Sequence, residues 1–283
     1  MAVIAFWSGS KKETGQTVSA AAIATYMAIE HNYKILLIDA TFNDDTLERC
    51  FWMINNNDKK DIARTLNKGK IDVSAGAEGL ASAIASNKAT PEIITNYTRV
   101  VFKNRLDVLC GLKTQIKEEY NKTIALYKDL VHTANKYYDL VFVDLEKTLK
   151  SDNTKAILEE ADIIMYDFTK NLKQADEYIS NMQKYPNILK KQKIIPLLSN
   201  SDEDTVYNAK NVTRYIGEKK EVPRIPYTPA FVKCISEADV ANYFLRNKLS
   251  GKVNDKNSEL LSACSYTCET IVKRLEELKY SVN

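Results

Sequence analysis

Short apolar runs alternate along the chain with longer segments in which apolar residues recur every three or four positions. The short runs are rich in β-branched residues and nearly continuous, as in Lys34 to Asp39 and Leu140 to Asp144, and such runs are typical of strands buried on both faces. The pattern predicts strands at Val3 to Trp7, Lys34 to Asp39, Leu106 to Cys110, Leu140 to Asp144, Ile163 to Asp167, Lys193 to Ser199 and Glu221 to Ile225.

The segments with a helical period are expected to form the outer layers. They predict helices over Thr17 to Glu30, Gln115 to Tyr137 and Ser258 to Lys279, because their apolar residues gather on one face at these spacings. Alternating strands and helices predict a mostly parallel sheet covered on both faces, which is a three-layer α/β/α sandwich. Residues 1–283 are expected to form a single domain, with Asn55 to Asn87 as a surface insertion.

Composition narrows the class of protein. The chain has 283 residues, 45% of them apolar and 27% charged, which is ordinary for a globular protein. Its formal net charge of +3 does not indicate nucleic-acid binding, although folding can still bring basic residues together in a local patch. Five cysteines and two histidines without regular spacing favour a reduced, cytoplasmic protein whose thiols, Cys264 and Cys268 among them, are buried. No apolar stretch reaches the roughly 18 residues of a membrane span.

The segment after the first predicted strand carries the candidate chemistry. It reads Ser8-Gly9-Ser10-Lys11-Lys12-Glu13-Thr14-Gly15-Gln16-Thr17 and leads into a predicted helix. A strand, a glycine-containing turn and a helix together present backbone N–H groups and a helix N-terminus to phosphate. The sequence lacks the lysine of a standard Gly-Lys-Thr, so an ordinary polar connection remains an alternative. Asp39 and Asp144 each end a predicted strand, at the edge where open α/β sheets bind ligands.

The order of these segments resembles the ParA/MinD family of deviant Walker A ATPases, which are P-loop NTPases of the SIMIBI class with a Lys-Gly-Gly-x-Gly-Lys-Ser/Thr loop. The resemblance rests on the loop, on Lys34 to Asp39, on the Walker B-like Tyr138 to Asp144 and on Ile225 to Pro229, and it spans nearly the whole chain. It implies ATP and Mg²⁺ as ligands. The implied site residues are Asp39 and Lys11 for catalysis, Gly15, Gln16, Thr17, Asn200, Pro226, Tyr227 and Thr228 for nucleotide binding, and Thr17 and Asp144 for the metal.

The resemblance also implies a role for each of these groups. Lys11 matches the signature lysine that reaches a partner's nucleotide across a dimer, Asp39 the carboxylate that positions water, and Asp144 the acid behind the metal. Gln16 stands where the family has the P-loop lysine, and a neutral amide cannot neutralise the phosphate charge that develops in the transition state. Lys12 and Glu13 replace two glycines, which restricts the backbone. Hydrolysis is therefore expected to be slow or absent.

Two functional hypotheses follow. The first is an ATP-responsive dimeric organiser that positions a macromolecular assembly through a protein partner, near the pilus-localising TadZ/CpaE branch but without a receiver-like domain ahead of the loop. The second is a pseudo-ATPase scaffold that acts without nucleotide. A plasmid or chromosome partition ATPase is a further alternative. The Lys273 to Lys279 face of the last helix is mixed in sign, so packing on the sheet is expected rather than membrane contact.

Overall fold

The computed structural model describes residues 1–10, 14–54, 76–86, 88, 90–147, 149–250 and 256–281. In this part of the chain one eight-stranded sheet runs through the molecule in the order β3-β4-β2-β5-β1-β6-β7-β8. The strands are β1 Ala2–Trp7, β2 Ile35–Ala40, β3 Arg99–Phe102, β4 Leu106–Leu109, β5 Leu140–Leu145, β6 Ile163–Thr169, β7 Ile194–Ser201 and β8 Arg224–Pro226. Strand β3 pairs antiparallel with β4, and the other neighbours pair in parallel.

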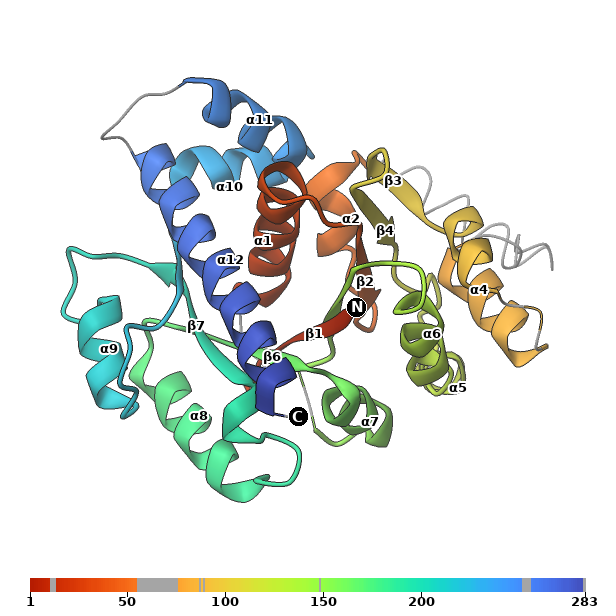
Figure 1. The fold of residues 1–283 in the computed structure, drawn as a ribbon, viewed down its shortest axis with the longest axis horizontal. Coiled ribbons are helices and arrows are strands. Elements are labelled where there is room, and N and C mark those ends of the chain that lie inside the picture. The colour runs from red at the N-terminus through yellow and green to blue at the C-terminus, as the bar shows by residue number, and fades with distance from the viewer. Residues whose placement is uncertain are drawn as a thin grey trace.

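Helices cover both faces of this sheet (Figure 1). One face packs against α1 Gln16–Glu30, α2 Thr46–Phe51, α10 Pro229–Ser236, α11 Val240–Ser250 and α12 Lys256–Ser281. The other face packs against α4 Gly76–Ala85, η1 Pro91–Asn96, α5 Lys117–Ile124, α6 Tyr127–Ala134, α7 Asp152–Glu160, α8 Leu172–Lys184 and α9 Ala209–Tyr215. A short 3₁₀ turn, η2 Lys191–Lys193, leads into β7. The predicted α/β/α sandwich is confirmed.

Alternation along β1 explains the two cores. Ile4 and Phe6 enter the core beneath α1, whereas Val3, Ala5 and Trp7 enter the opposite core, because successive side chains of a strand point to opposite faces. Helix α1 is enclosed between the sheet and the outer helices, and Ala20 to Ala24 are all fully buried. Small side chains permit this close approach of helix to sheet.

Two details differ from the predicted elements. The segment Gln115 to Tyr137 forms two helices, α5 and α6, rather than one. Each helix places one tyrosine hydroxyl at the end of β2: Tyr120 Oη donates to the Ala40 carbonyl at 2.7 Å and Tyr127 Oη to the Asp39 carbonyl at 3.4 Å. Strand β3 was not predicted, because its Arg99 and Val100 are exposed at the sheet edge and give no continuous apolar run.

Helix α12 lies against α1 and β8. Its Leu260, Cys264, Cys268 and Ile271 are buried, and the cysteines are free thiols. The predicted packing of this helix on the molecule is confirmed. Among the described helices, none has the length and apolar character needed to cross a membrane. The predicted insertion at Asn55 to Asn87 lies mostly outside the described residues, and only α4 and Ser86 of it are placed.

Candidate functional site

The loop between β1 and α1 is built around Gly15. This residue is the N-cap of α1 and has φ +76°, a left-handed backbone that favours glycine. A Cβ at this position would stand 2.8 Å from Ser199 Cβ of β7, so glycine also lets the loop lie directly on the neighbouring strand. The start of α1 is thus set at the carboxyl edge of the sheet, between the ends of β5 and β7. Lys11 lies outside the described residues, as do Lys12 and Glu13, and its catalytic role stays a prediction.

The side chain of Gln16 is bonded to strand β5. Its Nε2 donates to Asp144 Oδ1 at 2.6 Å and to the Leu145 carbonyl at 2.7 Å, and the residue is buried. Both amide hydrogens therefore serve as a tie between α1 and β5. With its side-chain amide engaged, Gln16 can bind a phosphate only through its backbone N–H at the helix N-terminus.

Thr17 and Asp144 meet beneath this tie. The Thr17 hydroxyl lies close enough to the Asp144 carboxyl group to lower the pKa of that group. Burial raises the pKa of Asp144 to about 6, against the hydrogen bonds from Thr17 and Gln16, which lower it. Asp144 Oδ2 is buried without a hydrogen-bond partner, so one acceptor of the site is unsatisfied.

The donor atoms at this point fit Mg²⁺. A hydroxyl and a carboxylate are hard oxygen ligands, and Mg²⁺ in nucleotide sites takes one or two protein ligands together with waters and phosphate oxygens. In the described part of the chain, no group of three or more His, Cys, Asp and Glu side chains is arranged to hold a metal. Thr17 and Asp144 would therefore hold Mg²⁺ only in company with phosphate. The ion would supply charge neutralisation for that phosphate.

Asp39 ends β2 in register with Asp144 of β5. Thr41 donates to Asp39 Oδ1 from its backbone N at 2.9 Å and its Oγ1 at 2.6 Å. Burial, with the nearby Asp144 charge second, raises the pKa of Asp39 to about 8. Gly111 makes room for the carboxyl group, since a Cβ there would stand 2.8 Å from Asp39 Oδ2. A carboxyl group that is mostly protonated at pH 7 is a weak acceptor for a water proton.

A third buried acid belongs to the site and was not predicted. Asp167 of β6 accepts a hydrogen bond from Ser199 Oγ at 2.8 Å, and Ser199 Oγ lies 2.8 Å from Ser19 Oγ of α1. Burial raises the pKa of Asp167 well above its usual range, and the Asp144 charge adds to this effect. The cluster joins β6, β7 and α1 directly under Gly15. Its signal in the sequence was an acid late in an apolar strand, the same signal that identified Asp39 and Asp144.

The residues expected to surround a base lie on the β7 and β8 side. Asn200 has φ +52° and sits at a register shift between β7 and β8, and its Nδ2 is 3.6 Å from the Cβ position of Gly15. Tyr227 donates its backbone N–H to the Ser201 carbonyl at 3.0 Å, which holds Pro226 to Thr228 beside the end of β7. A left-handed asparagine at a bulge is a typical feature of binding sites.

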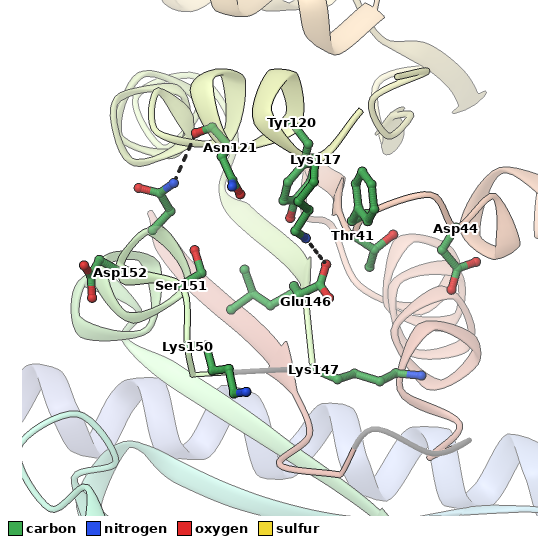
Figure 2. A pocket seen from close by; sticks show the side chains of 13 residues that line it. Thr41, Asp44, Lys117, Tyr120, Asn121, Glu146, Lys147, Lys150, Ser151 and Asp152 are labelled. Atoms are coloured by element: carbon green, nitrogen blue, oxygen red, sulfur yellow. Dashed lines mark hydrogen bonds and ion pairs between the residues drawn. The ribbon is translucent and has the colours of Figure 1, made fainter. Parts of the chain in front are cut away.

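A cavity of about 780 Å³ opens beside Thr41 and Leu145, close to Asp39 and Asp144. The segments after β2 and β5 form its walls with α5 and the start of α7 (Figure 2). Lys117 of α5 lies over the Tyr120 ring, 4.3 Å from its centroid, and 3.5 Å from Glu146. Thr41 and Lys147 also line this cavity, so it adjoins the carboxyl ends of β2 and β5.

Comparison with known proteins identifies solved structures of the same fold. Neither a protein-family model nor a curated protein sequence matches the chain. A ParA family ATPase from Chlorobium tepidum TLS gives a TM-score of 0.68 at 17% identity, over 92% of this chain and 96% of that one. MinD from Pyrococcus horikoshii OT3, complexed with Mg-ADP, gives 0.65 at 13% identity, over 96% and 97%. A protein assigned to plasmid partition in Borrelia burgdorferi B31, bound to AMPPNP, gives 0.57 at 15% identity, over 100% and 99%. The chain therefore has the fold of the ParA and MinD ATPases.

Proposed function

We propose that this chain binds Mg-ATP at the Gly15 loop and acts as an ATP-responsive, dimeric organiser of a localised assembly, with slow or no hydrolysis. The proposal rests on which residues of the site are kept and which one is replaced. Thr17 lies close to the Asp144 carboxyl group, where the two side chains would hold Mg²⁺, and Asp39 lies in register with Asp144. The residue at the lysine position, Gln16, is bonded to β5 instead.

The low hydrolysis rate has two physical causes. Gln16 places no ammonium beside the β- and γ-phosphates, and such charge stabilisation is usually the largest contribution to phosphoryl transfer. Asp39, with its pKa raised to about 8, is a poor partner for an attacking water at neutral pH. Nucleotide can thus bind without being hydrolysed, because the backbone N–H groups at the start of α1 and the Thr17 hydroxyl are still present to bind it.

Solved relatives support the nucleotide and the biological setting. The Pyrococcus MinD is complexed with Mg-ADP and the Borrelia partition protein is bound to AMPPNP. A spatial role for this chain, a homodimer and a protein partner are proposals by analogy with such proteins. The alternative is a pseudo-ATPase scaffold. The hydrogen bond from Gln16 to Asp144 favours it, because it engages the Asp144 carboxyl group without nucleotide.

Calorimetric titration with Mg-ATP, paired with sedimentation analysis, tests the proposal. We expect binding that Thr17→Ala weakens by at least about tenfold, because the variant removes a metal ligand, and dimer formation that depends on Mg-ATP. Thr25→Ala is the matched control, since Thr25 is buried on the same helix with an unpartnered hydroxyl. The absence of binding at millimolar Mg-ATP would overturn the proposal. Self-association that is indifferent to nucleotide and to Thr17→Ala would establish the scaffold.

A further inference from the structure

Three buried carboxyl groups surround the point where the loop leaves β1. Asp39, Asp144 and Asp167 lie near the carboxyl ends of β2, β5 and β6, and β1 runs between β5 and β6. The charge of Asp144 acts on both of the other two acids. A polyphosphate entering this site adds negative charge beside Asp144, so a protein cation close to the loop would favour its binding in addition to Mg²⁺.

The described part of the loop and α1 contains no such cation. Residues 14–30 include neither lysine nor arginine. Gln16 is neutral and its amide is already bonded to Asp144 and Leu145. Among the described residues, the positive charge that P-loop proteins place at this point would therefore come from another segment.

Lys147 stands on the segment that leaves β5, three residues after Asp144. Burial raises the pKa of Asp144 and of Asp167, and hydrogen bonds partly oppose this rise. The Lys147 charge is a smaller effect that also lowers the pKa of both acids. These carboxyl groups belong to β5 and β6, the two strands that flank β1, and Lys147 also lines the cavity beside the end of β5.

Lys147 is half-buried and has no ion-pair partner among the described residues. Lys117, which lines the same cavity, is instead held by Glu146 and by the rings of Phe42 and Tyr120. In Figure 2 the Lys147 side chain is extended, and its ammonium lies apart from the other labelled side chains. An unpaired, partly desolvated ammonium is disposed to take an anion.

We infer that Lys147 is a phosphate-binding cation of this chain, and that it supplies positive charge in place of the lysine absent at Gln16. This inference rests on the proposed binding of Mg-ATP and adds the residue that neutralises its phosphate oxygens. The positive charge then approaches from the segment after β5 rather than from within the loop. Its effect grows with the number of phosphates on the ligand.

Titration of the full chain with Mg-ATP, ADP and adenosine tests this role. We expect Lys147→Gln to weaken Mg-ATP binding by about tenfold or more, which corresponds to about 1.4 kcal/mol, to weaken ADP less and to leave adenosine unchanged. Lys122→Gln, on the exposed side of α5, removes the same charge elsewhere and should change Mg-ATP binding by less than about twofold. Lys147→Arg keeps the charge and should retain most of the affinity.

A second comparison uses the lysine position itself. Gln16→Lys should raise Mg-ATP affinity more in the Lys147→Gln background than in the wild-type chain, because two cations at one phosphate site are not additive. Equal affinities of the wild-type and Lys147→Gln chains for Mg-ATP would overturn the inference and leave the proposed function standing. A wild-type chain that binds no Mg-ATP would overturn both. An equal loss of affinity for ATP and adenosine would show that Lys147 acts on the fold rather than on phosphate.

Discussion

Gln16→Met tests the tie between α1 and β5 most directly. Methionine keeps the length of the side chain and its apolar stem but removes both donors, so Asp144 Oδ1 and the Leu145 carbonyl lose hydrogen bonds of 2.6 and 2.7 Å. A hydrogen bond to a charged group is worth about 1.5–3 kcal/mol and one to a neutral carbonyl about 0.5–1.5 kcal/mol. We therefore expect the free energy of unfolding to fall by about 2–4 kcal/mol.

Urea unfolding and thermal melting measure this loss. For a chain of this size about 2–4 °C in Tm corresponds to each kcal/mol, so the midpoint should fall by roughly 5–15 °C. The loss should be greater at pH 8 than at pH 5, because the amide bonds the charged form of Asp144, whose pKa is about 6. Gln183→Met, at an exposed position of α8, should stay within about 0.5 kcal/mol. If Gln16→Met is as stable as this control, the amide is not a structural tie and the reasoning is wrong.

Two further predictions concern the backbone and the buried acids. Gly15→Ala should cost at least about 1–2 kcal/mol of stability in chemical unfolding, because φ is +76° and the new Cβ meets Ser199; an unchanged midpoint would contradict the packing described. For Asp39 the native state holds a proton up to about pH 8, whereas the unfolded chain releases it near pH 4. Stability should thus fall as pH rises through that window, and Asp39→Asn should make the decline shallower by up to about 1.4 kcal/mol per pH unit. Urea unfolding at a series of pH values measures this decline. If the free energy of unfolding falls equally steeply in the wild-type and Asp39→Asn chains, the assignment is refuted.

The buried strands were predictable from the sequence because they are apolar on both faces. Lys34 to Asp39 and Leu140 to Asp144 correspond within a residue to β2 and β5. Strand β3 has exposed residues and pairs at an edge, so no local pattern marks it. The division of Gln115 to Tyr137 into α5 and α6 was not predictable, because apolar residues at spacings of three and four continue across the break.

Of the buried acids and their hydrogen-bond partners at the site, only acids at the ends of predicted strands could be identified from the sequence. Asp39 and Asp144 stand where apolar runs stop, and the parallel sheet brings such positions to one edge. The tie of Gln16 to Asp144 joins residues that are 128 positions apart, and it depends on the register of β1 with β5. Asp167 likewise finds its partner Ser199 on another strand. Hydrogen bonds between distant segments have no local signature in the sequence.

The enclosure of α1 limits how the molecule can move. Ala20 to Ala24 have no exposed surface, and a helix packed on all sides at crystal-like density cannot translate or rotate without opening the core. Glu146, Lys147, Lys150 and Ser151, which follow β5, instead line a cavity of about 780 Å³. Space for side chains to rearrange thus lies beside the end of β5, whereas α1 is surrounded by packed side chains.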